Sequence, residues 1–194
     1  AKIGGAAMTW HFRFGFVILS LLAFRLVWGL VGGRWSRFAS FVFEPGTVVR
    51  YLRGAAREGE QLDVGHSPLG SFSVFALLGI VAVQVGTGLF ADDEIANIGP
   101  LNRFVTTDTG LSLTSWHKTA GQWTLLTLVA LHVAAILYYL WVKKTDLVGP
   151  MLSGDKSLAA ATPASTDTWG TRLLALGLGG ACIALAGWVW KLGG

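Results

Sequence analysis

Four long apolar stretches constrain the fold of this chain more than any other feature of its sequence. They run from Phe14 to Val31, Phe72 to Phe90, Gly121 to Val142 and Leu173 to Trp190. Each is close to the roughly 20 residues that an α-helix needs to cross the hydrocarbon layer of a membrane. Only 13% of the residues are charged, whereas soluble domains carry roughly a quarter. The sequence therefore predicts an all-α integral membrane protein, a helical bundle with four transmembrane helices in this chain.

Basic residues indicate which ends of these helices face the cytoplasm. The segment from Gly33 to Ser71 contains five arginines, whereas the segment from Ala91 to Ala120 contains one arginine and one lysine. Lys143 and Lys144 follow the third stretch directly. Cytoplasmic loops are enriched in Lys and Arg, so the first stretch is predicted to run inward from the outer side. Residues Phe38 to Arg57 alternate apolar side chains with arginines and are expected to lie along the inner interface.

The ends of the chain suggest its organisation. Residues Ala1 to Ala7 resemble the tail of a preceding segment, and we expect a fifth helix ahead of the other four in the complete protein. Residues Ser153 to Asp167 are rich in Ala, Ser, Thr and Pro, which is typical of a flexible connector. We therefore divide the chain into a bundle at residues 1–152 and a linker with a C-terminal helix at residues 153–194.

Composition excludes several classes of site. The single cysteine, Cys182, lies inside the last apolar stretch, so no disulfide framework, cysteine zinc site or iron–sulfur cluster is expected. The net charge of +4 could indicate nucleic acid, but no Lys/Arg-rich run interleaved with aromatic residues occurs. We expect no nucleic-acid partner, and any metal must be held by other side chains.

All four histidines lie at or inside the edges of the apolar stretches: His11, His66, His117 and His132. His132 follows His117 by 15 positions, which on an α-helix is about 22 Å of rise and only about 60° of rotation. Since the first and third stretches both run inward, His11 and His117 should meet at the outer surface, where two neutral imidazoles can bind one haem iron axially. At the inner side His132 needs a partner, either His66 or a histidine on the preceding helix.

A single histidine at a helix end is more often an interfacial or hydrogen-bonded residue, so the ligand hypothesis depends on the set. Arg25 adds to it, because an unpaired cation inside a membrane span costs at least about 2.5 kcal/mol. A haem propionate is the expected anionic partner of Arg25, with Arg13, Arg34 and Lys118 as further candidates nearer the surfaces. For those three, contact with lipid headgroups is the more common alternative.

Four sequence motifs carry a resemblance to a known family. They are WHFRFGF at Trp10 to Phe16, FRLVWGLVGGRWSRFASFV at Phe24 to Val42, GHSPLG at Gly65 to Gly70, and WHKTAGQWTLLTLVALHVA at Trp116 to Ala134. Together they resemble the bacterial b-type cytochromes of the cytochrome b561 group, which includes membrane subunits of nickel-iron hydrogenases and formate dehydrogenases. The resemblance extends from Trp10 to about Lys156.

This resemblance implies a haem-binding bundle in a bacterial inner membrane, with two haems b that carry electrons between quinone and a redox partner. The partner would be a c-type cytochrome or another oxidoreductase subunit. His11 and His117 resemble the ligands of the outer haem, and His132 resembles one ligand of the inner haem. The family's second inner ligand comes from a first helix that this sequence lacks. Either that helix precedes the sequence, which we favour, or His66 takes its place; otherwise His66 could contact a propionate or a quinone headgroup.

Two other classes of function remain open from the residues. A small transporter or channel could use Arg25 and His132 to line a polar path, although no apolar stretch has a proline in its interior. A passive membrane anchor for a partner enzyme would need none of the histidines. Because two axial imidazoles leave iron no open position, we expect electron transfer rather than oxygen chemistry, and no catalytic residues in the chain.

Overall fold

The computed structural model describes residues 6–55, 57, 62, 64–156, 158 and 162–193. Four helices in this part of the chain are long and apolar enough to cross a membrane. They are α1 (Ala6–Val31), α3 (Pro68–Leu89), the continuous helix Thr107–Trp141, and α7 (Trp169–Lys191). The helix Thr107–Trp141 comprises α4 (Thr107–Trp116), the π-helical turn η4 (His117–Gly121) and α5 (Gln122–Trp141). The predicted all-α membrane bundle is confirmed.

Shorter elements connect these helices. They are η1 (Arg34–Ser36), η2 (Phe38–Ser40), α2 (Pro45–Leu52), η3 (Asn102–Phe104) and α6 (Val148–Ser153). Within the described residues, extended backbone pairs only at the isolated bridge between Asp92 and Ile98. The helix α6 was not predicted from the sequence. The prediction for Ala1 to Ala7 falls largely on residues outside the described part of the chain, and part of the predicted connector, at residues 157 and 159–161, also lies outside it.

The helices α3, α4 and α7 begin earlier than the apolar stretches, because polar capping residues and not hydropathy set their first turns. Ser67 accepts a hydrogen bond from the backbone N–H of Gly70 at 3.2 Å, directly before α3. Thr106 caps α4 in the same way, and Thr168 forms a capping box at the start of α7. Each cap satisfies a backbone donor that the first helical turn leaves without a partner. The third helix consequently starts at Thr107, well before the predicted Gly121.

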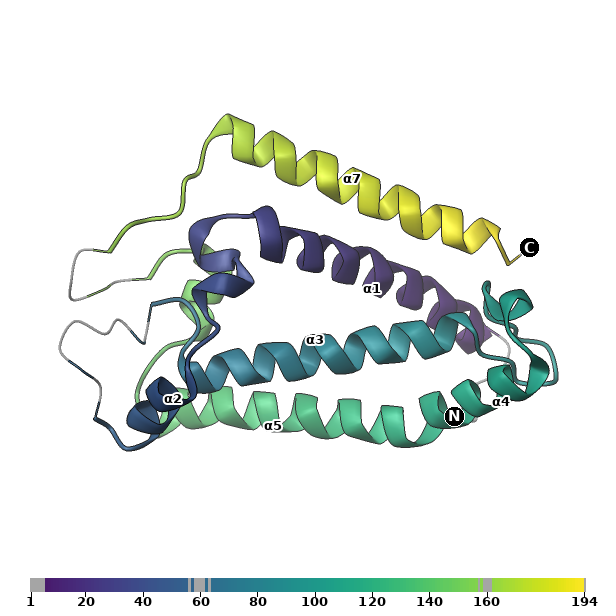
Figure 1. Ribbon diagram of the computed structural model, residues 1–194, viewed down its shortest axis with the longest axis horizontal. Helices are drawn as coiled ribbons and strands as arrows, with labels where there is room; N and C mark the ends of the chain where they lie inside the picture. Colours follow the sequence, from purple (N-terminus) through teal and green to yellow (C-terminus); the bar gives the residue numbers. More distant parts are fainter. Residues whose placement is uncertain are drawn as a thin grey trace.

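Neighbouring helices run antiparallel, and their order places the chain's loops at two opposite ends of the bundle. The helix α1 packs against α7 and α3, and α3 packs against α5, as Figure 1 shows. The Phe16 and Trp190 rings, 4.6 Å apart, join the start of α1 to the end of α7. At the other end, the Tyr51 and Tyr139 hydroxyls lie 3.1 Å apart and join α2 to α5. The first end carries η3 and α4, and the second carries α2 and α6.

An aromatic cluster fixes the arginine-rich segment to the bundle. Phe41 is among the most buried side chains of the chain, and its ring lies 5.9 Å from that of Phe38 and 5.5 Å from that of Phe75. A Cβ on Gly29 would overlap the Phe38 ring, so the absence of a side chain there lets the segment pack closely on α1. This cluster positions η1 and η2 against the ends of α1 and α3.

Candidate functional site

Two of the four histidines face each other at the end of the bundle that carries α4. His11 lies on α1 and His117 opens the turn η4. Their ring centroids are 6.0 Å apart, with the ring planes at 89° to one another. Antiparallel packing of α1, α3 and the third helix brings these rings together, although 106 positions separate them in the sequence.

The backbone of α3 orients His117. Its Nδ1 lies 3.0 Å from the carbonyl oxygen of Gln84 and 3.2 Å from Oγ1 of Thr87. Because a carbonyl oxygen can only accept, Nδ1 carries the proton and donates it, which leaves Nε2 with a free lone pair. Gln84 also uses its side-chain Nε2 to donate to the carbonyl oxygen of His117 at 3.3 Å. The tautomer and the position of His117 are thus both set by α3.

Space around His117 is equally restricted. A Cβ on Gly88 would come within 3.1 Å of Cε1 of the His117 ring. Gly121, which ends the π-helical turn, is buried, and a Cβ there would overlap the Gln84 amide oxygen and the Trp116 ring. A π-helical turn contains an extra residue compared with an α-helical turn and is frequent at functional sites. The rotation of about 60° between His117 and His132, expected for an unbroken α-helix, therefore does not apply here.

His132 lies on α5, nearer the opposite end of the bundle, and also contacts α3. Its Nδ1 is 2.9 Å from the hydroxyl oxygen of Ser73. Ser73 precedes Gln84 by 11 positions on α3, which is about three helical turns. Both histidines of the third helix therefore face the same side of α3 at different depths.

His66 lies in the loop before α3 and packs against Phe41, with 4.6 Å between the ring centroids. Its Nδ1 is buried and has no hydrogen-bond partner among the described residues. Burial, together with the positive charge of Arg25, lowers the pKa of His66 below its ordinary value, so the imidazole is neutral at pH 7. Within the described residues His66 has no hydrogen bond or ring contact with His132.

The two arginines of the predicted site have different surroundings. Arg25 donates from Nη1 to the carbonyl oxygen of Ser36 at 3.1 Å, and its Cζ lies 4.8 Å from the centre of the Phe38 ring. No carboxylate in the described part of the chain forms an ion pair with Arg25. Arg13 is exposed, with its Cζ 5.0 Å from the centre of the Trp10 ring. Arg25 therefore has hydrogen-bonding capacity left for an anion, and Arg13 faces outward.

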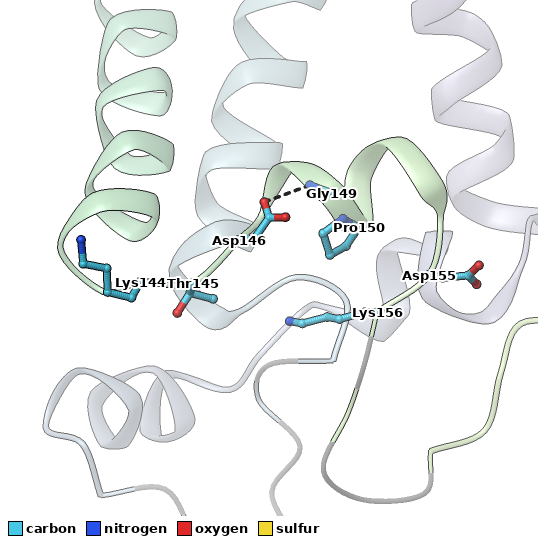
Figure 2. A pocket seen from close by; sticks show the side chains of 7 residues that line it. All are labelled: Lys144, Thr145, Asp146, Gly149, Pro150, Asp155 and Lys156. Carbon is cyan, nitrogen blue, oxygen red and sulfur yellow. Dashed lines mark hydrogen bonds between the residues drawn. The ribbon is translucent and has the colours of Figure 1, made fainter.

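None of the histidines lines the surface hollow beside Lys144. This hollow measures about 480 Å³ and lies in the segment after α5, as Figure 2 shows. Its walls are Lys144, Thr145, Asp146, Gly149, Pro150, Asp155 and Lys156. The Asp146 carboxylate accepts hydrogen bonds from the backbone N–H groups of Val148 and Gly149, the first two residues of α6. The carboxylate thus has a structural role in this hollow.

The comparison with known families identifies the family of the whole chain. A family model described as prokaryotic cytochrome b561 matches residues 1–154. The chain belongs to this family. No curated protein and no solved structure matches it. Membership identifies a multi-pass bacterial membrane protein, a b-type cytochrome that binds haem b and transfers electrons. The helix α7 lies beyond the matched residues.

The residues of this cytochrome b561 chain fit a haem at the His11–His117 pair. Two imidazoles on opposite sides of one metal ion, each with a bond of about 2 Å, place their ring centres roughly 6 Å apart. The observed separation is 6.0 Å. Histidine ligands usually donate their second ring N–H to a carbonyl or carboxylate, which fixes the tautomer. The contact from His117 to Gln84 has this form, and the contact from His132 to Ser73 is compatible with it.

The residues that orient these histidines, Gln84, Thr87 and Ser73, were not among the candidates predicted from the sequence. Their one sequence signal is polarity inside an otherwise apolar helix, where such groups tend to face the bundle interior. Threonine and serine can also satisfy their hydroxyls on their own helix, as Thr87 does at the carbonyl oxygen of Val83, so the sequence alone does not assign them to a histidine.

Proposed function

We propose that this chain carries electrons across a bacterial inner membrane through two haems b. In this proposal the imidazoles of His11 and His117 would hold the outer haem, and His132 would supply one ligand of the inner haem. Each haem supplies one-electron exchange at its iron. The protein supplies the ligands, their orientation and an apolar surrounding, and makes or breaks no substrate bond.

The facing of His11 and His117, with His117 held by its Nδ1, supports this proposal most strongly. The two histidines come from distant parts of the chain, and their ring centroids lie 6.0 Å apart, a separation that leaves room for one metal ion between them. Among the described residues no hydrogen bond joins them; instead His117 uses its protonated Nδ1 on Gln84. A free Nε2 lone pair in an apolar environment is the form that a metal requires.

We propose that a histidine on a further helix would supply the second ligand of the inner haem. His66 suits this role poorly, because its Nδ1 is buried and its ring packs on Phe41. We propose instead that Arg25 binds a propionate of the inner haem and that His66 lies beside a propionate or a quinone headgroup. Arg13, which is exposed near His11, is a candidate for a propionate of the outer haem.

The electron route is proposed to run between membrane quinone and a redox protein, either a c-type cytochrome or another subunit of an oxidoreductase complex. A pair of haems at different depths connects the two sides of the membrane, as the depths of His117 and His132 on the third helix would require. The bundle at residues 1–152 would hold both haems, and the linker with α7 would be an addition to it.

A visible spectrum of the purified protein tests the proposal. Six-coordinate haem b should give sharp reduced-minus-oxidised bands, and His117→Ala should remove one haem and leave the other. His66→Ala is the matched control, because it removes an imidazole that we do not propose as a ligand. A colourless protein would instead favour a transporter, a channel or a passive anchor. Retention of both haems in His117→Ala would contradict the ligand assignment.

A further inference from the structure

Two exposed arginines line a small hollow directly after the end of α1. The hollow measures about 230 Å³, and its walls are Arg34, Arg37, Ala39 and Ser40. A water molecule occupies about 30 Å³ in the liquid, so a phosphate group with several waters fits. The backbone around it is fixed, because the Ser40 N–H and the Ser40 hydroxyl both donate to the Arg37 carbonyl oxygen, at 3.0 Å and 2.6 Å.

The charge of this hollow is uncompensated. No Asp or Glu occurs between positions 32 and 43, and neither guanidinium has a hydrogen bond or ion pair within the described residues. The connector before α7 approaches here, since the Trp35 indole N–H donates to the Pro163 carbonyl oxygen at 2.9 Å. Asp167 on that connector is already paired with Arg172, at 2.7 Å. Two positive charges therefore face the surroundings together.

The hollow lies at the level of lipid headgroups. On one side of it, Leu30 and Val31 at the end of α1 are 71% and 54% exposed, and on the other side Val42 is 66% exposed. Such apolar side chains at the end of a transmembrane helix contact acyl chains, and the adjacent Trp35 is typical of the interface. The phosphates of a phospholipid leaflet lie just outside this apolar level.

We propose that Arg34 and Arg37 together bind the phosphodiester of an anionic glycerophospholipid, in the leaflet at the arginine-rich end of the bundle. Guanidinium groups bind phosphate through two parallel charge-assisted hydrogen bonds, which distinguishes them from lysines. Basic pockets on the cytoplasmic side of membrane proteins bind anionic headgroups in this manner. A zwitterionic headgroup would bring an ammonium group to a hollow without a carboxylate. The proposal does not depend on the haem assignment.

Native mass spectrometry of the full chain in detergent tests the proposal, with phosphatidylglycerol or phosphatidylcholine added at equal concentrations. The wild-type chain should retain one phosphatidylglycerol in preference to phosphatidylcholine. The double variant Arg34→Gln/Arg37→Gln should bind phosphatidylglycerol at least about tenfold more weakly, since each basic residue near an anionic headgroup contributes substantially. Its helical content by circular dichroism should equal that of the wild type.

Arg53→Gln/Lys144→Gln is the matched control, because it removes two exposed positive charges from the same end of the bundle without touching the hollow. It should retain the preference for phosphatidylglycerol. Equal loss in both double variants would overturn the proposal in favour of general charge attraction. Equal retention in the wild type and in Arg34→Gln/Arg37→Gln would also overturn it. Displacement of the lipid by millimolar inorganic phosphate would assign the hollow to a soluble anion instead.

Discussion

The hydroxyl of Thr87 should lower the reduction potential of the outer haem, and Thr87→Val tests this. Valine has nearly the same shape as threonine and lacks the oxygen that lies 3.2 Å from Nδ1 of His117. The hydroxyl hydrogen of Thr87 goes to the Val83 carbonyl oxygen at 2.8 Å, so its oxygen accepts from His117. An acceptor at Nδ1–H makes the imidazole more basic and favours ferric iron. Its removal should raise the potential.

The expected size follows from the two acceptors that share this proton. A neutral hydrogen bond contributes about 0.5–1.5 kcal/mol, and Thr87 is the more distant acceptor, since Gln84 lies at 3.0 Å. We therefore take about 0.5–1 kcal/mol as the amount by which the loss in the ferric state exceeds the loss in the ferrous state. For a one-electron couple, 59 mV corresponds to a tenfold change, so the shift is about 20–40 mV in the positive direction.

A redox titration followed in the visible bands of the haems measures the shift. Thr127→Val is the matched control, because Thr127 is an exposed hydroxyl on α5 without a contact to a candidate ligand. Only the haem that is lost in His117→Ala should shift in Thr87→Val. An unchanged potential for that haem, or an equal shift of both haems, would refute the assignment of Thr87 as a positioning residue.

Three further changes test other parts of the structure. Ser73→Ala removes the oxygen 2.9 Å from Nδ1 of His132 and should raise the potential of the inner haem alone; an effect on the outer haem would contradict the separate depths of the two sites. Gly29→Leu should lower the unfolding free energy by about 1–3 kcal/mol, because a side chain there overlaps the Phe38 ring and overpacks the site. Gly79→Leu is the control and should be neutral, since its Cβ has open space. Thermal unfolding of both variants compares the two effects. The pKa of His66 lies below its ordinary 6.5 in the folded protein, so the contribution of the neutral ring to stability is complete above pH 6.5 and is lost as the pH falls through the folded pKa. Between pH 7 and pH 5 the melting temperature should therefore fall less in His66→Gln than in the wild type. Identical declines would contradict the burial of the neutral ring.

The sequence predicts the helices and their order well because their signals are local. Apolar length identifies the four spans, and the alternating direction of successive spans determines which ends meet. The approach of His11 and His117 follows from this order alone. The ends of the helices were less predictable, since capping by Ser67, Thr106 and Thr168 depends on backbone geometry. Hydropathy identifies the residues that suit the apolar layer of a membrane, and the helices extend beyond those residues.

The π-helical turn and the contacts to α3 could not be derived in this way. A single extra residue in one turn, at His117–Gly121, leaves no mark in composition or hydropathy. It changes the direction of every side chain that follows relative to those before it, so the angle between His117 and His132 cannot be taken from ideal helix geometry. The hydrogen-bond partner of Arg25 could not be predicted either, because it is the backbone oxygen of Ser36, and every residue offers such an oxygen.

Together these contacts show that α3 orients the histidines of the third helix, a role that its own sequence does not suggest. It carries no proposed ligand, yet it contacts Nδ1 of both histidines on the third helix, through Gln84 and Thr87 at one depth and Ser73 at another. Packing of α3 on α5 therefore sets the orientation of both rings at once. The extra residue in η4 is compatible with this arrangement, because it changes the angle between the His117 and His132 side chains, and both rings face α3. In this bundle the geometry of the proposed electron route depends as much on the helix without ligands as on the helices that carry them.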